Sequence, residues 1–192
     1  MASTSTKATL EQRASEFLEF AQLRHRLSGF PYYATGSFRL QTMAWPDIDL
    51  NVLYAPLRRA EVLALGAECL RQLSPSWFEL RCTEKEPDSP GHFFLGFEVH
   101  WKRMLWNVDI WFLSEAEYEA GRRWLRRTDR QIDPSRRQLI VDLKRFLMRR
   151  KVYPNGIPSI DVYRAILEQD VDRSSFGTWF QEYQRRQPRV SK

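Results

Sequence analysis

The sequence predicts an α+β fold, with a small mixed sheet flanked by helices in the first two thirds and helices alone in the last third. Up to residue 113, segments with the period-two alternation of strands are interspersed with segments of helical periodicity. Every later segment has a helical pattern. At 192 residues, 43% of them hydrophobic, the chain is long enough to bury one core.

The first part of the chain predicts three helices and two strands, with a glycine turn after the first strand. Helical periodicity over residues 9–27 ends at a Ser-Gly pair, and the short aromatic segment 30–34 is typical of a strand. That strand runs into a turn at a glycine, which a short helix over residues 38–43 follows. Residues 47–54 alternate polar and apolar side chains and predict a second strand. A proline, which a first helical turn tolerates, then opens a helix over residues 56–73.

The middle of the chain predicts three more strands, and the remainder predicts helices. Residues 77–83 form a strand, residues 84–91 a polar loop, and residues 92–101 and 104–113 a hairpin that turns at a Lys-Arg pair. A Tyr-Pro-Asn-Gly run breaks the helical region that follows. The predicted helices there are 115–127, 134–151, 159–169 and 175–186.

Positive charge is concentrated in the second half of the chain. The formal charge is +6, and most of the excess lies in one short stretch. Such a stretch attracts phosphates, nucleic acid or an acidic membrane surface, although a charge run is also typical of a solvated helix face. Its members are Arg122, Arg123, Arg126, Arg127, Arg130, Arg136, Arg137, Lys144, Arg145, Arg149, Arg150 and Lys151.

Cysteine, histidine and hydropathy patterns exclude several classes of protein. Cys69 and Cys82 form neither a disulfide framework nor a zinc site, and the three histidines lack metal-ligand spacing. The N-terminal residues lack the apolar core of a secretion signal, and no apolar run has membrane-spanning length. We therefore expect a cytoplasmic protein with no membrane partner.

Three carboxylates are the strongest candidates for chemistry. Asp47 and Asp49 are two residues apart on a predicted strand, so their side chains point to the same face. Asp109 lies inside an otherwise apolar strand, where an ionised carboxylate is costly unless a cation or a donor meets it. If the two strands are neighbours, three acids converge, and a pair of divalent cations relieves their repulsion. The alternatives are a solvated Asp-x-Asp pair and an Asp109 paired with one of the arginines.

Gly36 and Ser37 precede the acid pair and are candidates for binding phosphate. Glycine allows the backbone to approach a ligand closely, and amides at the start of a helix favour phosphate oxygens. Ser37 adds a hydroxyl donor. Donors for phosphates and acids for metals are the two requirements of nucleoside triphosphate chemistry.

This pattern resembles the signature of the DNA polymerase β-type nucleotidyltransferase superfamily. Gly36-Ser37, nine further residues, the Asp47-Ile-Asp49-Leu strand and a later apolar-flanked Asp109 carry the resemblance. It implies that family's palm, a small mixed sheet with helices on one side. It also implies that the three aspartates hold two Mg²⁺ ions, or Mn²⁺ in their place, that Gly36 and Ser37 contact the triphosphate, and that Asp109 polarises the acceptor hydroxyl as a general base.

The C-terminal part is similar to template-independent enzymes, namely eukaryotic poly(A) polymerases and archaeal CCA-adding enzymes. In that group a lysine and a tyrosine nine positions later both contact the triphosphate, and Lys144 and Tyr153 have this spacing. Gly156-Ile-Pro-Ser159 is similar to the start of the helix that follows. The alternative is that Lys144 is one more cation of a solvated face. The candidate nucleotide-binding residues are Gly36, Ser37, Arg39, Lys144, Tyr153 and Ser159.

The resemblance implies two domains and leaves the acceptor open. Residues 1–127 would form the catalytic palm, and residues 128–192 a helical nucleotide-binding subdomain. The implied activity is template-independent transfer of a nucleoside monophosphate from a nucleoside triphosphate, with RNA as one acceptor that the basic helices suit. One alternative is a minimal transferase that AMPylates a protein or modifies a small molecule such as an antibiotic. The other is a non-catalytic relative that binds nucleotide or RNA.

Overall fold

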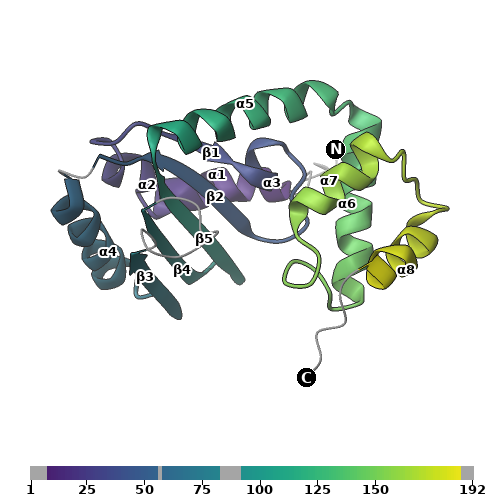
Figure 1. Ribbon diagram of the computed structural model, residues 1–192. Coiled ribbons are helices and arrows are strands. Elements are labelled where there is room, and N and C mark those ends of the chain that lie inside the picture. The colour runs from purple at the N-terminus through teal and green to yellow at the C-terminus, as the bar shows by residue number, and fades with distance from the viewer. Residues whose placement is uncertain (1–7, 56–57, 83–91, 187–192) are drawn as a thin grey trace, which may run out of the picture. The chain divides into compact units, whose positions relative to one another are not determined.

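A computed structural model describes residues 8–55, 58–82 and 92–186 (Figure 1). The expected helix start at Pro56 and the expected loop 84–91 lie outside the described residues. The chain divides into two compact units, Met1–Arg127 and Thr128–Lys192. Among the helices that the structure describes, none is long and apolar enough to cross a membrane.

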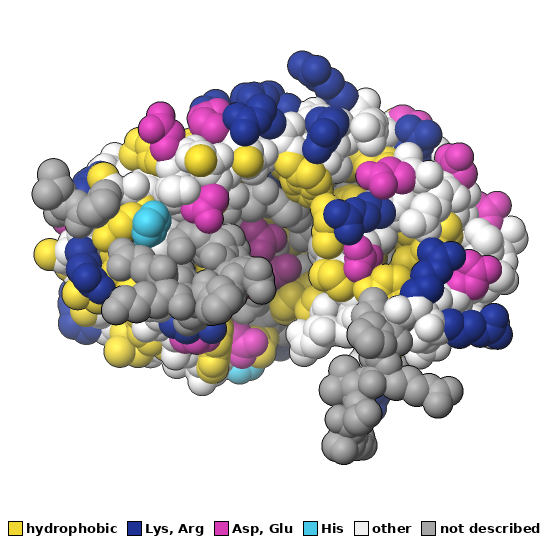
Figure 2. Space-filling view, in the orientation of Figure 1, with side chains coloured by type: hydrophobic (Ala, Val, Ile, Leu, Met, Phe, Trp, Pro, Cys, Tyr) yellow, Lys and Arg dark blue, Asp and Glu magenta, His cyan; other side chains and the backbone are white. Residues whose placement is uncertain are grey.

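The first unit contains the strands, and helices continue through the second. The strands are β1 (Tyr32–Thr35), β2 (Asp47–Leu53), β3 (Trp77–Cys82), β4 (Phe93–Trp101) and β5 (Met104–Leu113). The helices are α1 (Leu10–Phe20), α2 (Leu23–Arg26), α3 (Gly36–Arg39), α4 (Arg59–Leu73), α5 (Glu115–Gln131), α6 (Pro134–Arg149), α7 (Ser159–Glu168) and α8 (Phe176–Arg186). Lys and Arg side chains gather over α5 (Figure 2).

The five strands form one mixed sheet in the order β1-β2-β5-β4-β3. Strands β2 and β5 are parallel neighbours, and the other adjacent pairs are antiparallel. The parallel pair is the one predicted to contain all three aspartates. The α+β class and the small mixed sheet with flanking helices are therefore confirmed.

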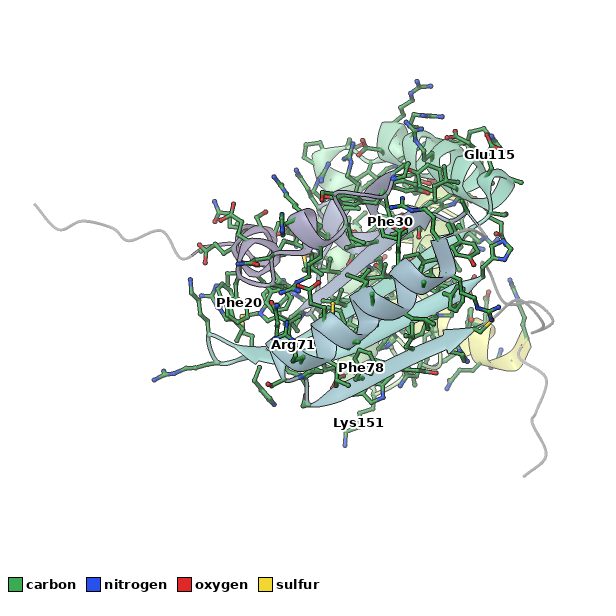
Figure 3. All side chains as sticks on the ribbon, turned by 90° about the vertical axis from the view of Figure 1, so that its left-hand side faces the viewer. Phe20, Phe30, Arg71, Phe78, Glu115 and Lys151 are labelled. Atoms are coloured by element: carbon green, nitrogen blue, oxygen red, sulfur yellow. The ribbon has the colours of Figure 1, made fainter. Side chains whose placement is uncertain are left out.

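One face of the sheet is apolar and forms the core. Alternate residues of β2 and β5 are buried, with Ile48 and Val108 at 0% exposure as neighbours in the register. Helix α4 lies across this face on the side toward the viewer in Figure 3, where Phe78 marks the strand behind the helix. Phe17 of α1 stacks on Trp106 of β5 with ring centroids 5.0 Å apart. Burying side chains of this size contributes roughly 1.5–3 kcal/mol each, which fixes the register that the opposite face inherits.

The opposite face is polar at β2 and β5, and the first turns of α5 cover one end of it. Asn51 donates from Nδ2 to the Tyr33 hydroxyl at 2.9 Å, and that hydroxyl donates to the carbonyl of Tyr118 in α5 at 3.1 Å. Gly121 lies so close to Tyr33 that a side chain there would collide with the phenol oxygen. These contacts hold the first turns of α5 near Asn51, two residues after Asp49 on β2.

The predicted single helix 9–27 is wrong, because the chain forms α1 and α2 with a break between them. Gln22 has a left-handed backbone, with φ 51°. A continuous helix would bring Arg24 and His25 onto the stripe that Phe17 and Ala21 bury. The break rotates the chain so that Leu23 is buried instead, at 1% exposure.

Other boundaries differ from the predictions by a few residues. The helix after the glycine turn spans residues 36–39 and not 38–43, since it begins at Gly36 and Gln41 (φ 55°) follows in a left-handed conformation. Helix α5 continues to Gln131, four residues past the predicted end. Helix α6 ends at Arg149, two residues before the predicted end.

The second unit has its own apolar core. Asp133 caps α6 by accepting a hydrogen bond from the backbone amide of Arg136 at 2.8 Å, and Pro134 occupies the first turn. Helices α6, α7 and α8 bury one apolar face each. The buried residues include Ile140, Leu143, Leu147, Val162, Ile166 and Phe176.

Candidate active site

The register of β2 and β5 brings the three predicted aspartates together. Asp49 pairs directly with Asp109 across the parallel strands, and Asp47 pairs with Asn107. In-register residues of neighbouring strands point to the same face of a sheet, so all three carboxylates lie on the polar face. One carboxylate oxygen from each aspartate lies within 4.8 Å of the other two. The predicted convergence is confirmed.

The carboxyl of Asp109 is strongly perturbed by its surroundings. Burial and the nearby charge of Asp47 raise its pKa from 3.8 to about 6, and Glu98 on β4 and Glu79 on β3 add to the rise. The alternative that an arginine neutralises Asp109 is not supported, since within residues 8–55, 58–82 and 92–186 no lysine or arginine forms an ion pair with it. A carboxylate cluster of this kind favours bound divalent cations.

Asn107 joins two of the acids and was not predicted. Its Nδ2 donates to Asp47 Oδ1 at 2.8 Å. A hydrogen bond from the same side chain to Asp109 holds the pKa of that carboxyl lower than burial alone would. One amide therefore orients two carboxylates. The only sequence signal was its position, two residues before Asp109 in an alternating strand and hence on the same face.

Gly36 packs against the acid cluster. It has a left-handed backbone, with φ +58°, and a β-carbon there would overlap the carboxylate of Asp49. Its neighbour Thr35 pairs with Asp49 across β1 and β2. Only glycine satisfies both the backbone conformation and the space. The glycine that was predicted for phosphate binding thus also makes room for a carboxylate.

Ser37 and Arg39 lie on the same short helix as Gly36. Ser37 is buried, at 4% exposure, and its carbonyl accepts a hydrogen bond from the amide of Thr42 at 2.8 Å. Arg39 lies in the last turn of α3. The structure brings both residues next to Gly36, and their contact with a triphosphate stays a prediction.

The candidate residues of the second unit form a cluster of their own. Tyr153 and Ser159 are joined by a hydrogen bond of 2.7 Å between the phenol and hydroxyl oxygens. The ammonium of Lys144 lies 5.8 Å from the centre of the Tyr153 ring. It also donates to the hydroxyl of Tyr163 on α7 at 3.4 Å. Lys144, Tyr153 and Ser159 are therefore neighbours, and Tyr163 is a member that the spacing argument missed.

Lys144 is not a cation of a solvated face. Its side chain has 0% exposure, whereas Lys151 on the same segment is exposed. A lysine is rarely held inside a protein without a specific use, because burial of an ammonium is costly. The alternative of a solvated cation is therefore wrong for Lys144.

Comparisons with known proteins place the fold. No protein-family model matches the chain. A search of curated proteins likewise finds no match. Among solved structures, the chain is similar to the poly(A) polymerase complex of GLD-2 with GLD-3, with a TM-score of 0.55 and 13% identity over 83% of this chain and 52% of that one.

Two further structures give the same result. A cytoplasmic RNA terminal U-transferase has a TM-score of 0.53 and 15% identity, covering 84% of this chain and 48% of that one. The Cid1 poly(U) polymerase with bound MgGTP has a TM-score of 0.52 and 17% identity, covering 82% of this chain and 48% of that one. The chain spans about half the length of each of these proteins.

These similarities define the class of fold. All three proteins are nucleotidyltransferases of the DNA polymerase β superfamily, so the chain has a nucleotidyltransferase fold. The resemblance inferred from the motifs is thereby confirmed at the level of the fold. Its palm-like sheet carries the three aspartates on adjacent parallel strands.

Proposed function

We propose that this protein is a metal-dependent, template-independent nucleotidyltransferase. It transfers a nucleoside monophosphate from a nucleoside triphosphate to an acceptor hydroxyl and releases pyrophosphate. The observation that carries the proposal is the convergence of Asp47, Asp49 and Asp109 on one polar face of a nucleotidyltransferase fold. A structural role would not need three carboxylates within 4.8 Å of one another.

The aspartates fit a pair of divalent cations. Carboxylate oxygens are the ligands that Mg²⁺ and Mn²⁺ prefer, and the three acids offer them from two neighbouring strands. When bound, the two ions would stabilise the negative charge of the attacking oxygen and of the leaving pyrophosphate. Gly36 keeps the space in which the Asp49 carboxylate lies.

Asp109 is suited to accept the proton of the acceptor. In the proposed step the acceptor oxygen attacks the α-phosphorus and its proton passes to Asp109. The bond from the α-phosphorus to the bridging oxygen breaks, and its electron pair leaves with pyrophosphate. A carboxyl with a pKa of about 6 is a better base near neutral pH than one at its ordinary value.

The remaining candidates would bind the triphosphate. Gly36 offers a close backbone beside Asp49, and Ser37 and Arg39 on the same short helix offer a hydroxyl and a guanidinium. In the second unit, the buried ammonium of Lys144 and the bonded pair Tyr153 and Ser159 offer a cation and two hydroxyls. All six residues are proposed to bind the triphosphate.

We infer RNA as the acceptor. The formal charge of +6 favours a polyanionic partner, and the similar solved structures include poly(A) and poly(U) polymerases and an RNA terminal U-transferase. The proposal includes no template, since those enzymes extend RNA ends.

Pyrophosphate release tests this function. Each of the four ribonucleoside triphosphates is supplied with Mg²⁺ and either a short single-stranded RNA or a dinucleotide. The Asp47→Asn/Asp49→Asn variant removes two proposed metal ligands without a change of side-chain size. Asp170→Asn, at an exposed position of the second unit, is the matched control.

The expected result is pyrophosphate release and RNA extension by the native protein and by Asp170→Asn, and neither by the double variant. Metal-dependent binding of a nucleoside triphosphate without transfer to any acceptor would contradict the activity and favour a non-catalytic relative. Transfer to a protein or small molecule but to no RNA would favour the minimal transferase.

A further inference from the structure

Helix α5 carries a stripe of arginines that the proposed chemistry does not use. Their spacing of three, four and seven residues from the first places them on one face of the helix. All four side chains are exposed, and Figure 2 shows Lys and Arg side chains gathered over this helix. The arginine stripe consists of Arg123, Arg126, Arg127 and Arg130.

Among the residues that the structure describes, none forms an ion pair with the arginine stripe. Arg122, beside the stripe, pairs with Glu119 at 3.0 Å and lies over the ring of Tyr118. Within the described ranges, by contrast, no member of the arginine stripe has a carboxylate partner. Four neighbouring guanidinium groups repel one another, so the helix holds them at a cost that an external anion would relieve.

Helix stability alone does not account for the stripe. Cations favour the C-terminal end of a helix, but this effect is limited to the last turn. Arg130 lies in that turn of α5, which ends at Gln131, whereas Arg123 and Arg126 lie at least a turn earlier. Three acidic residues of α5, Glu115, Glu117 and Glu119, lie before the stripe, and Asp129 lies within its span. Four arginines outnumber this one aspartate over residues 123–130, so the net charge of the span stays positive.

The dimensions of the stripe fit a polynucleotide backbone. Seven residues of an α-helix rise about 10 Å. This length corresponds to about three phosphates of one stacked nucleic-acid strand, measured along its axis. Guanidinium groups bind phosphate oxygens in a bidentate manner. The helix also follows β5 directly, with Ser114 alone between them, and β5 carries Asp109. An RNA strand on α5 would therefore be held by the helix that directly follows the proposed catalytic β-strand in the sequence.

A membrane surface fits the stripe less well. Helices that bind bilayers combine basic residues with an apolar face of Trp, Phe or Leu that inserts between the lipids. Within the described part of the chain, the large exposed hydrophobic residues are Phe20, Leu63, Leu70, Trp77 and Leu105, and none of them lies on α5. The helix buries its own Tyr118 and Leu125.

We propose that the arginine stripe binds the sugar–phosphate backbone of a single-stranded RNA and thereby holds the acceptor on the enzyme. That the RNA is the acceptor rests on the proposed function. The contact is with phosphates, so it is independent of base sequence and acts on acceptors long enough to reach α5. A dinucleotide has too few phosphates to use it.

Fluorescence anisotropy of a labelled single-stranded oligoribonucleotide tests the stripe. The protein is titrated in EDTA, so that binding is measured without catalysis. The stripe variant carries Arg→Gln at positions 123, 126, 127 and 130, and glutamine retains helix propensity. The control variant carries Arg→Gln at four exposed arginines elsewhere, namely Arg71, Arg103, Arg149 and Arg185. Both variants lose the same formal charge.

The stripe variant is expected to bind RNA on the order of tenfold more weakly at moderate salt, with a log–log salt slope smaller by about 2. The control variant should keep the native slope to within about 1. Thermal melting should be the same for all three proteins. Pyrophosphate release with a dinucleotide acceptor should be unchanged in the stripe variant, whereas extension of the long RNA should require more substrate.

Equal weakening of both variants would overturn the inference, because the attraction would then come from net charge alone. Sedimentation with phosphatidylserine vesicles that depends on the stripe, with RNA binding unchanged, would overturn it in favour of a membrane. Neither result affects transfer to the dinucleotide. Stripe-dependent RNA binding in a protein that releases no pyrophosphate would support the stripe and contradict the proposed function.

Discussion

The carboxylate of Asp49 lies directly against the α-carbon side of Gly36, where a β-carbon on residue 36 would overlap it. The glycine lies at the junction of β1 and α3, and the aspartate on β2. The pair couples the conformation of the glycine turn to the position of a proposed metal ligand. Several substitutions test how this cluster works.

Replacement of Gly36 by alanine should displace the Asp49 carboxylate. The variant also forces a side chain into a left-handed backbone at φ +58°. We expect a loss of stability on the order of 1 kcal/mol and a far larger loss of Mg²⁺-dependent triphosphate binding. Calorimetric titration with and without Mg²⁺ measures the second effect. Gly177→Ala is the control, since a β-carbon there has no neighbour within 4 Å. Native metal-dependent binding in Gly36→Ala would contradict the coupling.

Asp109→Asn should stabilise the metal-free protein while it abolishes transfer. Burial raises the pKa of Asp109 from 3.8 to about 6, so the folded protein holds this proton more tightly than the unfolded chain does. The native protein therefore loses stability as pH rises from about 4 to 6, by up to about 3 kcal/mol. Asparagine does not ionise and avoids that loss.

Thermal melting in EDTA checks the Asp109 prediction. The asparagine variant should melt above the native protein near pH 8, and the difference should shrink as the pH is lowered toward 4. Added Mg²⁺ should raise the melting temperature of the native protein only. An asparagine variant that is less stable than the native protein at pH 8 in EDTA would show that the ionised carboxylate of Asp109 does not destabilise the fold.

Asn107→Ala should shift the pH dependence of the reaction. The substitution removes the donor to Asp47, now at 2.8 Å, and the hydrogen bond that lowers the pKa of Asp109. The pKa of Asp109 then moves further up, and the acid limb of the pH–rate profile moves to higher pH. Asn51→Ala is the matched control, because Asn51 lies on the same face but donates to Tyr33. An unchanged acid limb in Asn107→Ala would rule out the positioning role.

Lys144→Met should weaken triphosphate binding without unfolding the second unit. Methionine fills similar space, and removing a fully buried ammonium relieves a desolvation cost. Affinity for nucleoside triphosphates should fall on the order of tenfold or more, with an unchanged or higher melting temperature. Lys151→Met, at an exposed position, should have no effect. Native affinity in Lys144→Met would assign the lysine to structure.

Patterns within single strands predicted the acid cluster well. The alternation in residues 47–54 placed Asp47 and Asp49 on one face, and burial of every second residue in β2 follows it. The isolated acid in an apolar segment identified Asp109. Their convergence depended on strand order, which the motif resemblance supplied.

Features that arise from packing between segments were not predictable. Asn107 acquires its role only because β5 aligns it with Asp47 of β2. Tyr163 approaches Lys144 across two helices that are 19 positions apart at these residues. The break at Gln22 follows from which residues the core accepts, a choice that helical periodicity alone does not record.

In the proposed mechanism, Asp47, Asp49 and Asp109 together bind two divalent ions with a nucleoside triphosphate. A crystal structure with Mn²⁺ and a non-hydrolysable triphosphate analogue tests it most directly, because anomalous scattering locates the ions. We expect two peaks about 4 Å apart, with oxygens of all three aspartates and of the triphosphate around them. Triphosphate bound away from the three carboxylates, or no metal peak between them, would contradict it.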